Sequence, residues 1–299
     1  MRKIRDCLIY VFVSLTSQLV QNIPRKASLR LGVHLGNLIY QVVKKRRQIT
    51  LKNLEMAFGK EKSQEEIQQI ARRSFQNMGK TMIEFLSSPR YTPEDFKDFV
   101  RYEGIENIRP YIEAGKGVIF ISAHFGNWEM IMLSVTYFLC PIYAVVQEFK
   151  HTKLDSLINN YRSQYDSKVV KKDKAVRDGL RILKNGGILA ILADQNAGEN
   201  GVFIDFFGVL ASVPKGPVVM AQRTGAILVN ILDTRQEDDT HIITISPPVE
   251  LENTGDPEQD IIVNTTKFVK YLENTIRKYP DQWLWMHNRW KTRPQKEKS

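Results

Sequence analysis

The chain has 299 residues, of which 42% are hydrophobic, a length and composition that suit one α/β domain with a large core and exclude a polytopic membrane protein. Its formal net charge is +10 at pH 7 and its pI is about 9.4, so we expect an anionic membrane surface, phosphorylated substrate, acidic carrier protein or nucleic acid as partner. The two cysteines, Cys7 and Cys140, form no metal-ligand spacing, which argues against zinc and disulfide bonds and favours a reducing compartment.

The N-terminal segment is predicted to associate with a membrane. Residues 7–24 carry no charged side chain, and basic residues flank them on both sides. Their number approaches the ~20 that a spanning helix needs, but the second half of the segment is rich in Ser, Thr, Gln and Asn. We therefore expect an anchor helix that lies in or dips into the bilayer, with its Lys and Arg side chains on the cytoplasmic side. An ordinary helix packed on the domain is the alternative.

Helical periodicity marks two further stretches, residues 27–41 and 64–86. Ser63 and Glu66 form a capping-box pattern at the start of the second stretch. The following residues, 87–96, contain two prolines and end this helical part of the chain.

After this point, short β-branched runs bounded by glycine alternate with helical segments. The expected strands lie within residues 117–123, 143–147, 186–194, 225–232 and 241–251, and the expected helices within 128–139, 174–185, 214–224 and 260–279. This alternation predicts an α/β fold with a mostly parallel central sheet flanked by helices. No stretch resembles an interdomain linker, so we expect a single domain over residues 47–299 after a helical, membrane-associated region over residues 1–46.

The segment SAHFGNWEM, residues 122–130, places a histidine and a glutamate five positions apart. On a helix such residues point about 140° apart, and on a strand they face opposite sides, so His124 and Glu129 can meet only if the chain turns between them. Gly126 and Asn127 supply the expected turn from a strand to a helix. Glu129 then lies in the first helical turn, where the helix dipole favours its ionised form. A carboxylate that accepts from one imidazole nitrogen leaves the other free as a general base.

Other interpretations of this segment remain open on the residues alone. His124 can be a hydrogen-bonded core histidine, with Glu129 at the surface. A zinc site is disfavoured because it needs three or four ligands and no His-Glu-x-x-His pattern occurs. A serine or cysteine nucleophile is disfavoured because the chain lacks a Gly-x-Ser-x-Gly elbow and both cysteines lie in apolar segments.

The segment SAHFGNWE resembles the active-site segment of the bacterial lipid A biosynthesis acyltransferases, the late-acting enzymes of a wider glycerolipid acyltransferase group that shares His-x4-Asp/Glu. Further blocks are similar to this family and follow in its order: RRQITLKNLEMAF, ADQNAG with FIDFFG, VPKGPVVMAQRTGAILV and WLWMHNRWKTRP. The resemblance implies a glycerolipid acyltransferase-like fold. The chain departs from it at VLASVPKG, where some members have a threonine-rich stretch, which leaves the preference for acyl chain or acceptor open.

The resemblance also implies the roles of individual acidic and basic residues. His124 corresponds to the catalytic base and Glu129 to its acidic partner, and glutamate at this position points to the lipid A branch. Asp194 corresponds to an important aspartate of the family, and we expect it either to hold Arg162 or to position the acceptor. A purely structural ion pair is the alternative for Asp194.

Further side chains are expected to position the substrate or the developing oxyanion. Arg162 is the loose match to the family's downstream arginine and offers a bidentate fork, with Arg177 and Arg181 as alternatives. Asn127 and Gln195 are additional positioning candidates. We expect backbone amides of the strand-to-helix turn to meet the oxyanion, together with Arg162.

Aromatic residues near glycine suggest the lining of an acyl channel, although such residues more often pack in a core. The candidates are Phe125, Trp128, Phe206 and Phe207. The tail, residues 283–294, mixes Trp with Arg and Lys, which is typical of a bilayer interface. His287 in the tail is a second candidate base, ranked below His124 because no acid lies near it in the sequence.

The implied reaction moves a fatty acyl group from an acyl thioester to a hydroxyl of a lipid A precursor. Acyl carrier protein is the expected donor and acyl-CoA the alternative, and no metal or cofactor is required. An acidic carrier suits a basic protein surface. The expected place of action is the cytoplasmic face of the bacterial inner membrane.

Three other functions remain open on the sequence. A lysophospholipid, glycerol-phosphate or other lyso-lipid acyltransferase shares the chemistry and differs in the acceptor. A non-catalytic protein that binds anionic membranes keeps the basic surface but does not need His124, Glu129 and Asp194 together. A nucleic-acid binder is disfavoured because no helix-turn-helix, zinc finger or aromatic RNA-binding motif is present.

Overall fold

The computed structural model describes residues 2–148 and 151–294. Within them, one sheet contains β1 (Val100–Glu103), β2 (Val118–Ser122), β3 (Ile142–Val146), β4 (Lys168–Lys171), β5 (Ile188–Leu192), β8 (Ile227–Arg235) and β9 (His241–Ile245). Their spatial order is β1-β9-β8-β2-β5-β3-β4. Every neighbouring pair in this sheet is parallel except β8 and β9, which pair antiparallel. The predicted α/β fold with a mostly parallel sheet is confirmed.

Strand β2 lies in the middle of the sheet and is buried along its whole length. Its side chains alternate between two apolar clusters, because successive residues of a strand face opposite sides of the sheet. Val118 and Phe120 pack on the side of α7 (Trp128–Phe138), whereas Ile119 and Ile121 belong to the cluster on the other side of the sheet. Burial on both faces explains why this strand reads as a continuous apolar run in the sequence.

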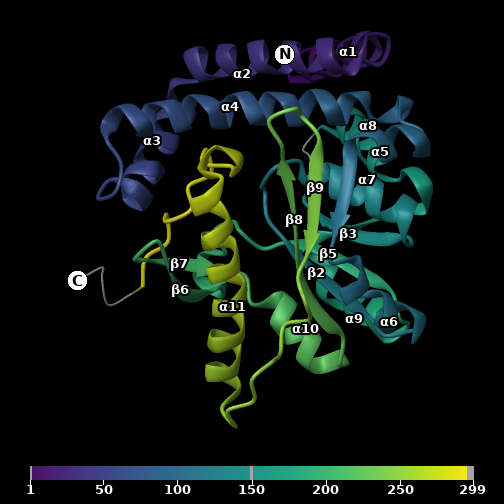
Figure 1. Cartoon of the computed structure of the whole chain (residues 1–299), viewed down its shortest axis with the longest axis vertical. Helices are drawn as coiled ribbons and strands as arrows, with labels where there is room; N and C mark the ends of the chain where they lie inside the picture. The colour runs from purple at the N-terminus through teal and green to yellow at the C-terminus, as the bar shows by residue number, and fades with distance from the viewer. Residues whose placement is uncertain (1, 149–150, 295–299) are drawn as a thin grey trace.

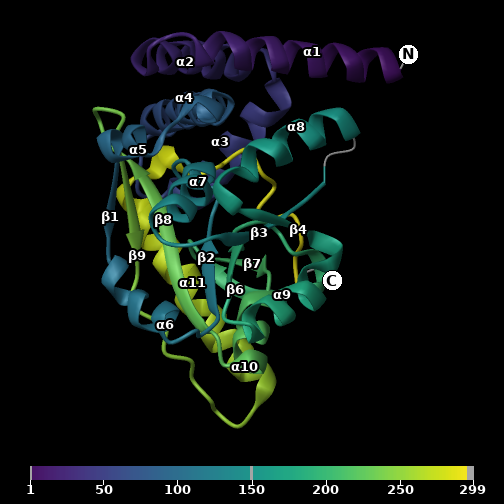
Figure 2. The same cartoon turned by 90° about the vertical axis from the view of Figure 1, so that its right-hand side faces the viewer.

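Helices cover both faces of the sheet (Figures 1 and 2). They include α5 (Pro93–Phe99), α6 (Arg109–Glu113), α8 (Thr152–Arg162), α9 (Ala175–Lys184), α10 (Gly216–Thr224) and α11 (Pro257–Lys278). An antiparallel hairpin of β6 (Val202–Phe206) and β7 (Val209–Val213) lies apart from the main sheet. The helical periodicity therefore predicted α7, α9, α10 and α11, but it left out α5, α6, α8 and this hairpin.

The N-terminal helices form a separate layer above one edge of the sheet (Figure 1). They are α1 (Arg2–Gln21), α2 (Arg25–Val42), α3 (Lys44–Phe58) and α4 (Gln64–Ser87). Helix α2 packs closely on α4 through glycines: a Cβ atom on Gly36 would lie 2.2 Å from the carbonyl oxygen of Phe75. The predicted capping box between Ser63 and Glu66 is present at the start of α4.

The N-terminal extension is helical, as predicted, with 20 residues in α1 and 18 in α2. No helix within the described ranges is both long and apolar enough to cross a membrane. Helix α1 instead exposes Leu8, Phe12, Leu15 and Leu19, each more than half exposed. The predicted boundary between residues 46 and 47 falls inside α3, a continuous helix.

Candidate active site

His124 lies just beyond the carboxyl end of β2, in a turn that leads directly into α7. The turn requires Gly126, whose φ is 57° and whose substitution would place a Cβ atom 2.1 Å from the carbonyl oxygen of Asp233. Asn127 is the N-cap of α7, and its side-chain oxygen accepts from the backbone N–H of Met130 at 3.1 Å. The predicted sharp turn between His124 and α7 is therefore confirmed.

The carboxylate that contacts the imidazole belongs to Asp194, not to Glu129. His124 Nδ1 donates to Asp194 Oδ1 at 2.8 Å, and the backbone N–H of His124 donates to Oδ2 at 3.0 Å. The two residues meet because β2 and β5 are parallel neighbours in which Ser122 pairs with Leu192. Each residue lies two positions beyond its strand, at the same edge of the sheet.

Trp283, from the segment after α11, completes this arrangement. Its indole Nε1 donates to Asp194 Oδ2 at 2.9 Å, so the carboxylate accepts three hydrogen bonds. Burial alone would raise the pKa of the Asp194 carboxyl, but the His124 charge and these hydrogen bonds outweigh it and lower the pKa. Asp194 is therefore ionised and accepts from Nδ1, so the ring carries a proton on Nδ1.

The other ring nitrogen of His124 is placed to accept a proton. The side chain is 19% exposed, and Trp128 contacts the ring edge-on with centroids 5.0 Å apart. Gln195 Nε2 lies 3.5 Å from Nδ1 and 3.4 Å from Nε2. These nearly equal distances put the amide beside the ring, away from the Nε2 lone-pair axis, which leaves that axis open to a hydroxyl.

Glu129 is paired with Arg162 instead of His124, so the predicted contact between His124 and Glu129 is wrong. Arg162 Nε donates to Glu129 Oε2 at 2.9 Å, and Arg162 Nη2 donates to the other carboxylate oxygen. Burial would lower the pKa of the Arg162 guanidinium, but the Glu129 carboxylate outweighs it and raises the pKa. The pair joins the first turn of α7 to the last turn of α8, where each charge complements its helix dipole.

This pairing also corrects the roles expected of two arginine partners. Asp194 does not hold Arg162, because the Arg162 fork is bound to Glu129. The alternatives Arg177 and Arg181 lie on α9, have 75% exposed side chains and approach Asp178. Arg162 is thus the candidate arginine that the fold brings beside the His124 turn.

Four backbone amides of the turn, those of residues 124–127, are occupied by other acceptors and are not available to an oxyanion. The N–H groups of residues 124–127 donate, in order, to the Asp194 carboxylate, the Ala123 carbonyl, the Gln282 carbonyl and the Asp233 carboxylate. Among the predicted side-chain donors, Gln195 has its amide within 3.5 Å of the imidazole.

Three of the four candidate channel residues lie in the core. Phe125, Phe206 and Phe207 are buried, and Phe206 stacks with Trp290 at a centroid distance of 5.7 Å. These phenylalanines therefore pack as core residues, the alternative named for them above, whereas the half-buried Trp128 lies beside His124. Phe206 and Phe207 are buried because the tip of the β6–β7 hairpin packs against the tryptophans of the C-terminal segment.

The tail is also packed inside the protein and does not place its tryptophans at a surface. Trp283, Trp285 and Trp290 are all buried. His287 Nε2 accepts from the backbone N–H of Asn196 at 3.1 Å, and burial lowers the pKa of His287. His287 is therefore neutral with its acceptor nitrogen occupied, which argues against it as the base.

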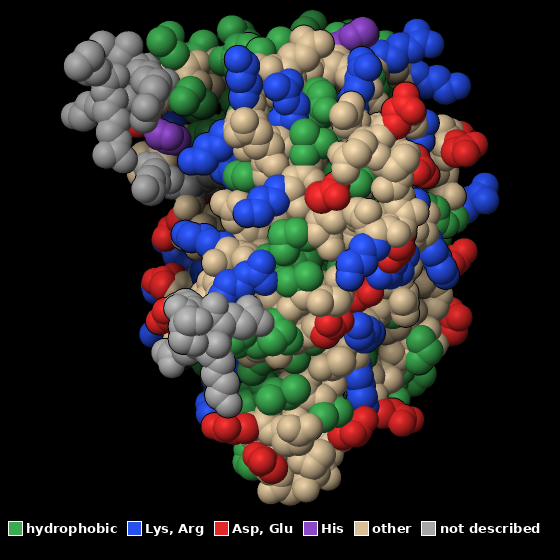
Figure 3. Space-filling view, turned by 90° about the vertical axis from the view of Figure 1, so that its left-hand side faces the viewer, with side chains coloured by type: hydrophobic (Ala, Val, Ile, Leu, Met, Phe, Trp, Pro, Cys, Tyr) green, Lys and Arg blue, Asp and Glu red, His purple; other side chains and the backbone are tan. Residues whose placement is uncertain are grey.

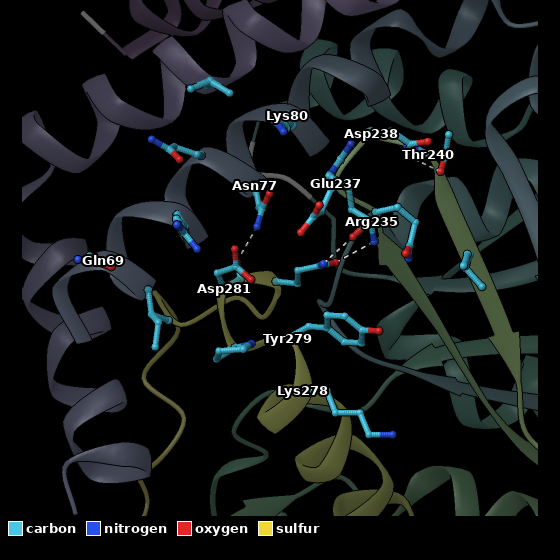
Figure 4. Close-up of a pocket in the computed structure, with 18 of the residues that line it drawn as sticks. Gln69, Asn77, Lys80, Arg235, Glu237, Asp238, Thr240, Lys278, Tyr279 and Asp281 are labelled. Atoms are coloured by element: carbon cyan, nitrogen blue, oxygen red, sulfur yellow. Dashed lines mark hydrogen bonds between the residues drawn. The ribbon is translucent and has the colours of Figure 1, made fainter. Parts of the chain in front are cut away.

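A surface pocket of about 1200 Å³ opens between α4, the β8–β9 hairpin and the segment after α11 (Figure 4). Charged side chains of both signs line it, including Lys80, Glu237 and Lys278, but His124, Glu129 and Asp194 do not. Gln282, in its wall, exchanges two hydrogen bonds of 2.8 Å with the backbone of Arg235. No residue of 122–130 lines the pocket, so it does not open beside the imidazole. Within the described ranges, no group of three His, Cys, Asp or Glu residues is arranged to hold a metal ion.

Comparisons with known proteins agree with the sequence resemblance. The family model described as bacterial lipid A biosynthesis acyltransferase matches residues 1–292. The chain is 25% identical over 273 residues to the lipid A biosynthesis palmitoleoyltransferase of Escherichia coli K12, covering 90% of this chain and 86% of that protein. It is 26% identical over 281 residues to the lipid A biosynthesis lauroyltransferase of the same organism, with coverages of 93% and 89%. It is also 24% identical over 190 residues to a phosphatidylinositol mannoside acyltransferase of Mycolicibacterium smegmatis, with coverages of 62% and 60%.

Proposed function

The chain belongs to the bacterial lipid A biosynthesis acyltransferase family and is an acyltransferase; from this we propose that it moves a fatty acyl group from a thioester to a hydroxyl of a lipid A precursor, with His124 as general base. One observation carries the assignment of the base: His124 Nδ1 donates to the buried Asp194 carboxylate at 2.8 Å. The second ring nitrogen is left to act on the acceptor.

The reaction needs one proton relay and no covalent enzyme intermediate. His124 Nε2 takes the proton of the acceptor hydroxyl while its oxygen forms a bond to the thioester carbonyl carbon. The tetrahedral intermediate then collapses, the carbon–sulfur bond breaks, and the leaving thiolate takes the proton back from Nε2. The products are an ester and a free thiol. Positioned general-base catalysis of this kind contributes about 10²–10⁴-fold to the rate.

The other roles in the reaction belong to Asp194, Gln195 and Arg162. Asp194 orients the imidazole and stabilises the imidazolium that forms during the reaction. The side-chain amide of Gln195 lies 3.4 Å from Nε2 and is placed to donate to the developing oxyanion. The pair of Arg162 and Glu129 fixes the start of α7 beside the base.

The donor we favour is an acyl group on acyl carrier protein, with acyl-CoA as the alternative. Lys44, Lys45 and Arg46 are exposed at the start of α3. Arg46 also donates to the carbonyl oxygen of Met286 at 3.0 Å, which ties this basic cluster to the tail that supplies Trp283. An acidic carrier would therefore meet positive charge close to the site.

The acceptor we favour is a lipid A precursor, because the matching family and the two relatives from Escherichia coli are named for lipid A biosynthesis. A second acceptor class, a phosphorylated glycolipid or lyso-lipid, is favoured by the similarity to a phosphatidylinositol mannoside acyltransferase. The two classes share the hydroxyl chemistry and differ in the body of the acceptor.

We further propose that the N-terminal layer rests on the cytoplasmic face of the inner membrane. Hydrophobic side chains lie along the top of the molecule, where α1 and α2 run, with Lys and Arg side chains nearby (Figure 3). Exposed apolar residues of these helices include Phe12 and Leu15 on α1 and Leu38 and Val42 on α2. Apolar and basic side chains on one surface suit interfacial binding to an anionic bilayer.

The proposal is tested with purified protein, acyl carrier protein or CoA thioesters, and either a lipid A precursor or a lysophospholipid. We expect His124→Ala to remain folded and to lose about 10²–10⁴-fold in kcat. Gln222→Ala, which removes an exposed polar side chain of α10, is the control and retains activity. Full turnover by His124→Ala would rule out the mechanism, and exclusive transfer to the lysophospholipid would rule out the lipid A acceptor.

A further inference from the structure

A cluster of charged side chains is buried directly behind the His124 turn. Its members are Glu84 on α4, Asp233 and Arg235 on β8, and His241 on β9, none of them more than 6% exposed. We call these four residues the buried charged cluster. Ionised groups at this depth lose their hydration, so each must find partners inside the protein.

Glu84 accepts hydrogen bonds from four separate segments of the chain. Its Oε1 accepts from Arg25 Nη2 on α2 at 2.5 Å and lies 3.2 Å from His241 Nε2. Its Oε2 accepts from Arg235 Nη2 at 2.5 Å and from the side-chain amide of Asn127 at 2.9 Å. Burial would raise the pKa of the Glu84 carboxyl, but these cations outweigh it and hold the pKa well below its ordinary range.

Asp233 and Glu84 are joined by a shared histidine. His241 Nδ1 lies 2.9 Å from Asp233 Oδ2, while its Nε2 faces Glu84. Since both neighbours are carboxylates, both ring nitrogens donate and the ring carries a proton on each. The two acids, although 149 positions apart in the chain (233 − 84), therefore form one connected unit.

Asn127 is held by this unit through its two donor groups, whereas its two oxygens both accept from the Met130 N–H of α7. Its backbone N–H donates to Asp233 Oδ2 at 2.5 Å, and its side-chain amide donates to Glu84. Its side-chain oxygen caps α7 on Met130. Asn127 is three residues from His124 and two from Glu129, so its position sets the turn that carries the first and the helix that carries the second.

We propose that Glu84 and Asp233 are positioning residues for acyl transfer, which hold Asn127 and thereby fix the geometry of the His124 turn. The catalytic part of this inference rests on the function proposed above. Two further contacts fasten the same turn, since Thr81 Oγ1 donates to the Gly126 carbonyl at 3.1 Å and the Gln282 carbonyl accepts from the Gly126 N–H at 3.0 Å. Neither acid touches the reacting atoms.

The presence of four ionisable side chains in the buried charged cluster supports a positioning role and not stabilisation alone. Apolar residues of the same volume usually stabilise a core as well as buried ions do, so the ions need another reason to be there. Directional bonds that converge on one asparagine supply that reason. A catalytic base held within a fraction of an ångström gains rate, because a misplacement of about 1 Å can cost about 10²-fold.

The test compares Asp233→Asn and Asn127→Ser with the core variant Leu272→Ala, at matched loss of Tm. Leu272 is a buried residue of α11. None of the hydrogen bonds described above involves it. In Asn127→Ser, the hydroxyl oxygen can still cap α7, whereas the side-chain amide that donates to Glu84 is removed. This variant therefore tests the proposal even if Asp233→Asn fails to fold. Both kcat and KM are measured, together with deuterium uptake of the peptide 122–130.

We expect Asp233→Asn and Asn127→Ser to lower kcat by about 10- to 100-fold with KM within about twofold, and to speed exchange in residues 122–130. Leu272→Ala should leave both quantities near the wild-type values. Losses of kcat no larger than in Leu272→Ala, or wild-type exchange in this peptide, would overturn the proposal. Exchange does not depend on turnover, so it distinguishes failure of this inference from failure of His124 as the base.

Discussion

His124 and Asp194, 70 positions apart, are joined by two hydrogen bonds, one to the imidazole ring and one to the backbone of the histidine. Ring Nδ1 lies 2.8 Å from one carboxylate oxygen, and the backbone N–H of the same histidine lies 3.0 Å from the other. One carboxylate thus fixes both the ring and the chain that carries it. A pair of this geometry supplies a base of defined tautomer at the edge of a sheet.

Replacing Asp194 by Asn should therefore lower kcat by about 10²–10⁴-fold, the range of general-base catalysis. The amide keeps the size of the side chain, but it can accept on one atom only, so the imidazole and the backbone N–H of His124 compete for it. Steady-state kinetics with acyl carrier protein as donor measure the effect, and circular dichroism checks the fold. A kcat within tenfold of the wild type would contradict the role given to Asp194.

The sequence located the turn but not the partner of the histidine. Gly126 and Asn127 are local signals, and the expected strand, turn and helix all appear around them. The contact between His124 and Asp194 depends on the pairing of β2 with β5 and on the register of that pair. The spacing of residues within one segment predicts neither the pairing nor the register. The sequence did place both residues just after apolar runs, at the carboxyl ends of parallel strands, and that was the signal that they meet.

The buried charged cluster and the aromatic core were missed for related reasons. Glu84 sits within a helical stretch, and Asp233 and His241 border an apolar strand and its neighbour, so each one alone reads as a surface residue. Only the antiparallel pairing of β8 with β9 brings Asp233 beside His241. Likewise, Phe206 on the β6–β7 hairpin packs on Trp283 and Trp290, which lie far later in the chain, and composition alone does not reveal this contact.

Glu129 and Arg162 should behave as a single unit in a double-mutant cycle. Their side chains are 11% and 15% exposed, so removing one partner leaves the other charge in poor solvent, at a cost of about 3–5 kcal/mol in stability. We expect Glu129→Gln combined with Arg162→Gln to be less destabilised than the sum of the single variants, with a coupling energy of about 0.5–3 kcal/mol. Chemical denaturation measures all four proteins. Additive effects would show that the pair is not coupled.

Phe206→Ala should affect folding and not the choice of acyl chain. The ring is 1% exposed, and its centroid lies 4.8 Å from that of Phe207 and 5.5 Å from that of Trp283. Loss of such a ring typically costs about 3–5 kcal/mol of unfolding free energy. Thermal denaturation checks the stability, and competition between thioesters of different length checks the selectivity. A changed preference for acyl-chain length at unchanged stability would show instead that Phe206 lines an acyl channel.

His241 should make the stability of the protein depend on pH above neutrality. Burial and Arg235 lower its pKa, but the Asp233 and Glu84 carboxylates outweigh them, so the pKa is raised above its ordinary value of about 6.5. A raised pKa means that the stabilisation is complete below about pH 6.5 and is lost as the pH rises through the folded-state pKa. The stability difference between wild type and His241→Gln should therefore shrink between pH 6.5 and 9. Urea denaturation over this range measures it, and parallel curves for the two proteins would speak against a charged His241.

Helix α1 should bind anionic bilayers through Phe12 and Leu15, whose side chains are 69% and 60% exposed. Burying one such side chain gains about 1.5–3 kcal/mol, so replacing both by Ser should weaken binding to phosphatidylglycerol-containing vesicles by at least about tenfold, as measured by cosedimentation. Leu210→Ser is the matched control, because Leu210 is 37% exposed on β7, away from the α1–α2 layer (Figure 1). Added salt should weaken the residual vesicle binding of the double variant more steeply than the binding of the wild type. In the double variant, the basic side chains supply most of the attraction to the bilayer, and salt screens it. Equal losses in the control and in the double variant would show that the α1 surface is not what contacts the bilayer.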